Sequence, residues 1–126
     1  MLLLDFYQSI LQLADEALVD RAVKCSEVKM LKQGDYLIRQ GEVPTHMYFL
    51  LSGVLRGFLL DLNGKDMTDC IVFRCGDAVM PDNDYTQPAS ITLEALTDCE
   101  LVSISLPETL RLLEKYPCLN HLHYKL

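Results

Sequence analysis

The sequence predicts a mainly β fold with flanking helices, arranged as a sandwich or a closed jelly-roll barrel. Between residues 27 and 105 we expect about seven or eight short strands, because apolar segments alternate there with glycine-containing turns. On either side, apolar residues recur at the spacing of amphipathic helices. We therefore expect an N-terminal helical segment (1–26), a barrel (27–105) and C-terminal helices (106–126).

Composition and charge narrow the possible functions. The chain has 126 residues, 50% of them hydrophobic, which suits one domain with a real core. Its net charge of −7 argues against binding to nucleic acid or to an anionic membrane surface. No apolar run is long enough to span a bilayer, and a signal peptide is not recognisable. Five cysteines without a Cys-x-x-Cys motif favour a reducing cytoplasm.

The first segment is predicted to be a helical pair or one broken helix that ends near Ser26. Its first apolar face is formed by Leu3, Phe6, Tyr7, Ile10, Leu11 and Leu13. Strands then follow at residues 27–31, 36–40, 46–53, 54–62 and 66–74. Asn63-Gly64 predicts a hairpin between the last two strands, because both central positions of such a turn tolerate a positive φ.

Gly57 lies inside a predicted strand, where glycine indicates a bulge or a close backbone approach. Residues 81–89 form an irregular loop with two prolines. In the next strand, Ile91, Leu93 and Ala95 are expected to face opposite to Ser90, Thr92 and Glu94.

A last helix begins after Ser105. This serine and Glu108, three residues later, fit a capping box, and Tyr116-Pro117 ends the helix. Residues 118–126 are expected to open a further helix.

Several glycine motifs occur in a specific order: Gly34-Asp35, Gly41-Glu42, the segment MYFLLSG (47–53), Gly64-Lys65 and Gly76-Asp77. Together they resemble the cyclic-nucleotide-binding domain of the cyclic AMP receptor protein and fumarate–nitrate regulator (Crp/Fnr) family of bacterial transcription factors. The resemblance covers essentially the whole chain. It implies a double-stranded β-helix barrel that senses a small-molecule effector.

The resemblance also implies what surrounds the barrel. In the family a long helix pairs two subunits, and a helix-turn-helix domain then binds DNA. Leu119 and Leu122 stand where this dimerisation helix would start. We expect a homodimer in the full-length protein, and a DNA-binding domain that lies outside this chain.

The nucleotide-binding members of the family hold the ligand with a Gly-Glu pair and a later Arg-Ser-Ala or Arg-Thr-Ala. Met80-Pro81 and Ala89-Ser90-Ile91 align with these positions. A buried cyclic phosphate needs a paired positive charge, which arginine supplies as a fixed fork of donors. No lysine or arginine lies between Arg74 and Arg111. The cassette is therefore degenerate, and we predict that the domain does not respond to cyclic AMP.

The candidate effector pocket contains Arg56, Met80, Pro81, Tyr85, Ala89, Ser90 and Ile91. Arg56 would either face the barrel interior and replace the missing cation, or point to solvent and pair with a carboxylate. Tyr85 would stack on a ligand or pack within its loop. Ser90 would donate to a ligand or be solvated.

We expect no metal, cofactor or catalytic set. His46, His121 and His123 are poorly spaced for a metal, and the cysteines do not match an iron–sulfur pattern. We expect buried structural thiols, with a reversible oxidation sensor at Cys75 in a turn as the alternative. Two alternatives to the effector-sensing function remain. The domain is either a ligand-free structural or dimerisation domain, with Met80 and Ile91 filling the pocket, or a cyclic-nucleotide-binding module with a non-standard pocket. A cavity lined by these loop residues would favour effector sensing, whereas a solid core there would favour the structural domain.

Overall fold

The computed structural model describes residues 2–81 and 86–116. Seven strands are found in this part of the chain: β1 (Ser26–Leu31), β2 (Tyr36–Ile38), β3 (His46–Ser52), β4 (Leu55–Leu60), β5 (Asp66–Val72), β6 (Thr92–Ala95) and β7 (Cys99–Ser105). The helices are α1 (Leu3–Asp5), the π-helical turn η1 (Phe6–Ile10), α2 (Glu16–Cys25) and α3 (Leu106–Lys115).

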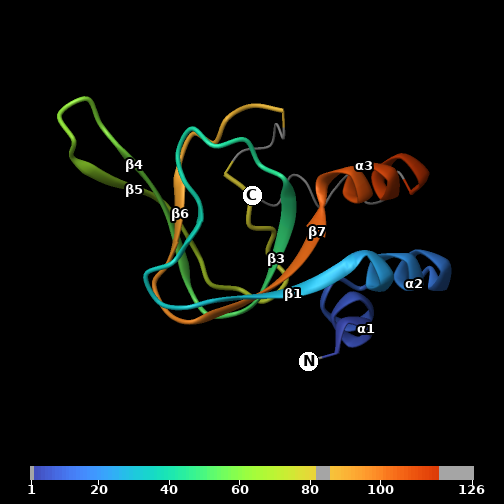
Figure 1. The fold of residues 1–126 in the computed structure, drawn as a ribbon. Coiled ribbons are helices and arrows are strands. Elements are labelled where there is room, and N and C mark those ends of the chain that lie inside the picture. The colour runs from blue at the N-terminus through green and yellow to red at the C-terminus, as the bar shows by residue number, and fades with distance from the viewer. Residues whose placement is uncertain (1, 82–85, 117–126) are drawn as a thin grey trace.

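The strands form two sheets that face each other, with the helices at one side (Figure 1). One sheet has the order β1-β7-β3 and the other β2-β6-β4-β5, and every pairing is antiparallel. Neighbouring strands in these sheets are mostly distant in sequence, as a jelly roll requires. The predicted mainly β fold with flanking helices is confirmed.

The sheet β1-β7-β3 is covered on both faces, which explains the nearly continuous apolar run in β3. Met47 and Phe49 pack with the helices, whereas Leu50 belongs to the cluster inside the barrel. Alternation of this kind follows from the period of two residues in a strand. Strand β3 therefore connects the barrel interior to the helical layer.

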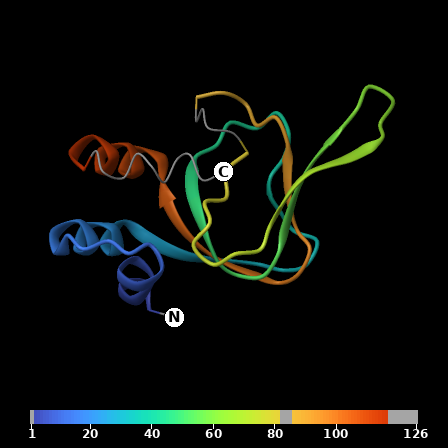
Figure 2. The ribbon, with the colours of Figure 1, turned by 180° about the vertical axis from the view of Figure 1, so that it is seen from behind.

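The helical layer forms as the spacing predicts. Gln12, with a φ of 56°, separates η1 from α2, and the Asp15 carboxylate caps α2 by accepting from the Leu18 N–H (3.1 Å). Helices α2 and α3 lie side by side against the β1-β7-β3 sheet in both views (Figures 1 and 2).

Ser105 caps α3 by accepting from the Glu108 N–H (3.4 Å), as predicted. The carboxylate of Glu108 accepts from the Cys25 thiol (3.2 Å) and pairs with Arg111. The glutamate of the predicted capping box therefore connects α3 to the end of α2.

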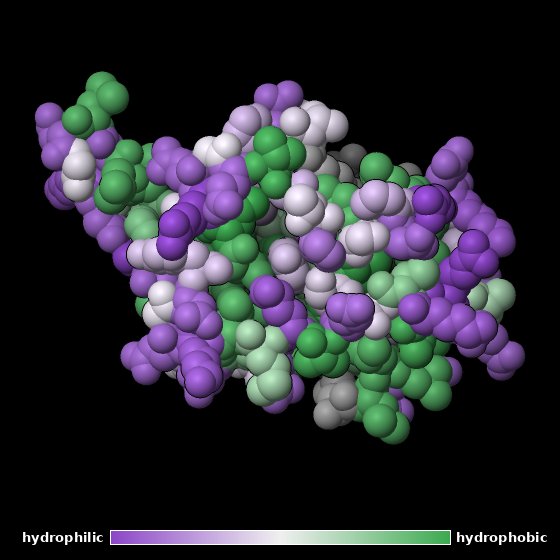
Figure 3. Space-filling model, viewed as in Figure 1, coloured by the Kyte–Doolittle hydropathy of each residue, from purple (hydrophilic) through white to green (hydrophobic). Residues whose placement is uncertain are grey.

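The hairpin between β4 and β5 forms where it was predicted, but its turn differs. Leu62 and Asn63 occupy the central positions, and only Gly64 takes a positive φ, of 78°. The reason is Asp61, whose carboxylate accepts from the N–H groups of Asn63 and Lys65 at 2.8 Å and favours this longer turn. The hairpin projects from the barrel (Figure 1), and its outer end carries green and purple residues together in Figure 3. Leu62 in its turn is fully exposed.

Gly57 shows both features that were expected of it. The pairing of β4 with β5 shifts register between Gly57 and Phe58, which marks a bulge. A Cβ atom at Gly57 would lie 2.6 Å from Ile91 Cδ1 and 2.7 Å from Cys70 Sγ. The side chains of Ile91 and Cys70 therefore occupy the space beside the Gly57 backbone that a Cβ atom would need.

Some predictions fall outside the described residues. These concern Tyr85 in the loop, and Cys118, Leu119, His121, Leu122 and His123 at the C-terminal end. Among the helices that the structure describes, none has the length and apolar character needed to cross a membrane.

Candidate functional site

A cavity of about 160 Å³ lies at one end of the barrel. Its walls are β2, the loop between β2 and β3, the first residues of β3, and the segment 79–81. The Val79 N–H donates to the Tyr48 carbonyl (2.8 Å), which fixes this segment beside β3. Segments that are distant in sequence thus meet around one space.

The floor of the cavity is apolar. Val79, Met80 and Leu93 are buried there, and Leu37 and Ile38 from β2 complete it. Such a floor suits the apolar part of a ligand, because covering it removes apolar surface from water.

The rim of the cavity carries four polar side chains: Glu42, Thr45, His46 and Tyr48. The Glu42 carboxylate accepts a hydrogen bond from the Arg39 N–H (2.6 Å), which orients it. Thr45 Oγ1 and His46 Nδ1 lie 2.8 Å apart, and the rings of His46 and Tyr48 are stacked with centroids 6.0 Å apart. Burial raises the pKa of Tyr48, so its phenol stays neutral and is able to donate.

Positive charge is scarce at this site. Neither lysine nor arginine is found among the described residues that line the cavity, while Glu42 contributes a carboxylate. An anion entering here would lose water without gaining the permanent positive charge of a lysine or arginine. The lining therefore favours neutral or cationic groups.

The structure separates the predicted site residues into different environments. Met80 and Pro81 line the cavity. Ala89 is buried next to the loop, because its N–H and carbonyl pair with Glu42 and Gly41 (both 2.8 Å). Ser90 is exposed, and Ile91 packs inside the barrel against Gly57.

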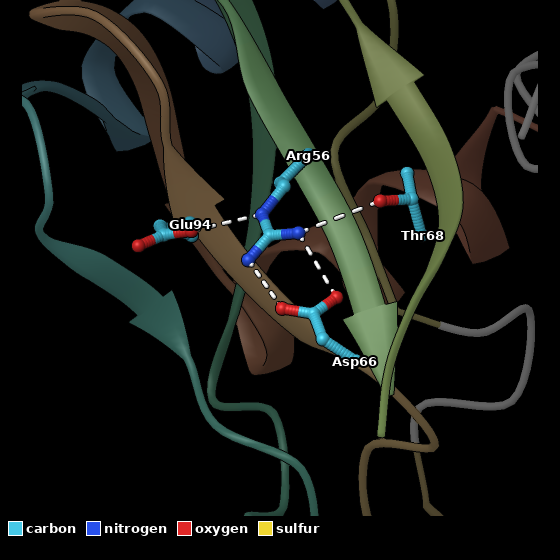
Figure 4. A network of polar contacts seen from close by, with 4 residues as sticks. All are labelled: Arg56, Asp66, Thr68 and Glu94. Carbon is cyan, nitrogen blue, oxygen red and sulfur yellow. Dashed lines mark hydrogen bonds and ion pairs between the residues drawn. The ribbon is translucent and has the colours of Figure 1, made fainter. Parts of the chain in front are cut away.

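Arg56 lies away from this cavity, in a polar network on β4, β5 and β6 (Figure 4). Its guanidinium donates to Asp66 through two nitrogens (3.0 and 2.8 Å), to Glu94 (2.9 Å) and to Thr68 (3.4 Å). It also lies over the Phe58 ring, 4.1 Å from the centroid. The hydrogen bonds to Asp66 and Glu94 raise the pKa of Arg56. Of the two environments considered for Arg56, the structure gives the carboxylate pair.

The polar rim could not be recognised from the sequence. Glu42 and Tyr48 lie within glycine motifs that were interpreted only as structural, and Thr45 and His46 lie beside them. The one available signal was alternation, which turns Tyr48 away from Met47 and Phe49.

The four cysteines that the structure describes, Cys25, Cys70, Cys75 and Cys99, are free thiols. Burial raises the pKa of the Cys25, Cys70, Cys75 and Cys99 thiols, which disfavours the reactive thiolate. In the ranges 2–81 and 86–116 there is no group of three or more His, Cys, Asp or Glu side chains placed to hold a metal ion.

Comparison with solved structures finds the same fold in several other proteins. The sensor domain of the transcriptional regulator DNR from Pseudomonas aeruginosa superposes with a TM-score of 0.79 and 21% identity, covering 94% of this chain and 84% of that one. The Thermus thermophilus catabolite activator protein gives 0.74 and 21%, covering 93% of this chain and 53% of that one. The regulatory domain of Toxoplasma gondii PKA, solved with cAMP, gives 0.74 and 20%, covering 87% and 42%.

The chain spans about half of the Thermus protein (53%), and no curated protein matches it in sequence. Residues 28–116 match the family described as Cyclic nucleotide-binding domain, whose members are regulatory domains and typically not enzymes. The chain therefore belongs to the cyclic nucleotide-binding domain family and resembles the sensor domains of Crp/Fnr-type transcriptional regulators.

Proposed function

We propose that this domain senses a small-molecule effector other than cyclic AMP, within a longer Crp/Fnr-type regulator. In this proposal residues 27–105 bind the effector, and residues 106–126 lead toward a dimerisation helix that includes Leu119 and Leu122. The full-length protein is a cytoplasmic homodimer that binds DNA through a separate domain. Binding rather than catalysis is the activity of this chain.

The observation that carries the proposal is the charge of the cavity. A buried phosphate needs a cation, but the described lining offers Glu42 and neither lysine nor arginine. Ala89, which aligns with the family arginine, is a buried apolar side chain. The volume of about 160 Å³ is also below the roughly 300–1,000 Å³ of pockets for drug-sized ligands.

A direct contact joins the cavity to the helical layer. The Leu106 N–H, at the start of α3, donates to the carbonyl of Thr45 on the cavity rim (3.0 Å). Suppose that the rim can adopt two positions. A ligand that binds one of them more tightly than the other would therefore shift α3 and the segment that follows it. This is the physical route from effector to dimer interface in the proposal.

A thermal-shift panel tests the proposal. Because a ligand of the folded state raises the melting temperature by mass action, cyclic AMP and cyclic GMP should leave it unchanged, whereas a matching metabolite raises it. The Toxoplasma gondii domain, solved with cAMP, serves as the positive control. A rise with cyclic AMP at micromolar concentration would contradict the proposal and favour a cyclic-nucleotide-binding module with a non-standard pocket.

A second candidate function is a structural or dimerisation domain without an effector. Ile91 favours it, because this side chain fills the barrel interior against Gly57 and Cys70. A metabolite panel without any stabilising compound, together with a stable dimer of the full-length protein, would support this second function.

A further inference from the structure

We infer that the cavity bounded by Glu42, Tyr48 and Met80 binds a molecule of about one six-membered ring that is neutral or cationic and donates hydrogen bonds. This inference rests on the proposed function and specifies the chemical class of the effector. Three properties of the cavity carry it: volume, charge, and the separation of apolar from polar lining.

The volume of the cavity suits a single ring. The cavity measures about 160 Å³. An engineered apolar cavity of about 150 Å³ in another protein binds benzene. A nucleotide, which combines a base, a sugar and a phosphate, is much larger than one ring.

The rim selects the sign of the ligand charge. The Glu42 carboxylate is exposed at the mouth and is held in place by the Arg39 N–H (2.6 Å). It attracts a cation and repels an anion, with moderate strength because it is solvated. As a carboxylate is an acceptor only, a neutral ligand needs a donor to bond with it.

The division of the lining sets the orientation of the ligand. Val79, Met80 and Leu93 form the buried floor, and Glu42 and Thr45 lie at the exposed mouth. The ring would cover the floor, where the Met80 thioether makes favourable contacts with aromatic rings. Its polar substituent would point outward to the Glu42 carboxylate.

Three ring compounds of nearly equal size test the inference: benzylamine, benzyl alcohol and benzoate. Each is titrated into methyl-labelled protein while the NMR signals of Val79, Met80 and Leu93 are followed. We expect benzylamine to bind about 2–5-fold more tightly than benzyl alcohol, and benzoate about tenfold more weakly than benzylamine. Equal binding of benzoate, or no shift of these three signals with any probe, would overturn the inference.

Two variants locate the binding. Glu42→Gln keeps an acceptor for the Arg39 N–H but removes the charge, so benzylamine and benzyl alcohol should bind equally. Val43→Phe blocks the mouth, where Val43 is 55% exposed, and should weaken all binding at least about fivefold. Val28→Phe on β1, at a valine that is 47% exposed outside the cavity lining, is the matched control and should bind as wild type. Unchanged binding by Val43→Phe would overturn the inference even if Glu42→Gln does not fold.

The outcomes separate this inference from the proposed function. A melting-temperature rise with cyclic AMP contradicts the proposed function whatever the ring probes do. If neither cyclic AMP nor the ring probes bind, but a larger metabolite raises the melting temperature, only the inferred ligand class is contradicted.

Discussion

At the scale of single residues, the barrel interior depends on a glycine. Gly57 leaves room for the Ile91 side chain and for the Cys70 thiol, which would lie 2.6 and 2.7 Å from a Cβ atom at this position. Contacts of this length do not occur between real side chains, so a methyl group here must displace its neighbours. The interior is therefore filled here because the small Gly57 leaves space for the large Ile91 side chain.

We predict that Gly57→Ala lowers the free energy of unfolding by about 1–3 kcal/mol, because it overpacks the core. Ile91→Val removes the Cδ1 atom that clashes and costs about 0.5–1.5 kcal/mol alone. In the double variant the two losses should therefore be less than additive, as measured by urea denaturation. Strictly additive losses would show that Gly57 and Ile91 do not share this space.

Tyr7 links stability to pH. The side chain is 2% exposed and bonds with Ser26, and burial raises its pKa from 10.0 to about 12. Because the folded state holds this proton more tightly than the unfolded state, its contribution is complete below pH 10 and is lost as pH rises from 10 to about 12.

Tyr7→Phe should destabilise the protein at neutral pH because it removes the hydrogen bond with Ser26. Since phenylalanine does not ionise, this loss should shrink by up to about 2–3 kcal/mol at alkaline pH. Tyr36→Phe, at a tyrosine that is 44% exposed, is the control and should show no such trend. Melting temperatures measured across this range test the prediction, which fails if the Tyr7→Phe difference is constant with pH.

At the scale of elements, the Arg56 network fastens three strands together. Its guanidinium on β4 bonds to Asp66 on β5 and Glu94 on β6, and covers the ring of Phe58 (Figure 4). The side chain of Arg56 is 23% exposed, so the pairs are partly shielded from water. The network lies at the base of the projecting hairpin and supports its orientation.

We expect Arg56→Lys to lower the free energy of unfolding by about 0.5–1.5 kcal/mol, since an ammonium cannot reproduce the planar fork that serves both carboxylates. Arg74→Lys is the control: its guanidinium lies over the Phe73 ring and pairs with no carboxylate within residues 2–81 and 86–116. Equal losses in chemical denaturation for the two variants would contradict a special role for Arg56.

At the scale of the whole molecule, the elements could be predicted from local patterns. Alternation identified β6 with its buried Leu93 and Ala95, and the buried Ile91 directly before it. Thr92, which was expected to face the other way, is buried as well. Ser105 marked the start of α3. The predicted type of turn at Gly64 was wrong, because the Asp61 carboxylate accepts from backbone N–H groups of the turn and favours a longer loop.

The candidate site was less accessible to sequence reasoning. Met80 and Pro81 were predicted from the resemblance and line the cavity, but the rim of Glu42, Thr45, His46 and Tyr48 is created by packing between distant segments. The carboxylate partners of Arg56 come from β5 and β6 and depend on strand register. Such contacts are set by tertiary structure, on which a local pattern carries no information.

We propose that this cyclic nucleotide-binding domain lacks the charge needed to hold a cyclic phosphate. Equilibrium dialysis of the chain against radiolabelled cyclic AMP tests it most directly. The account predicts equal concentrations of nucleotide on both sides of the membrane at micromolar ligand. Saturable retention of one cyclic AMP per chain would contradict it.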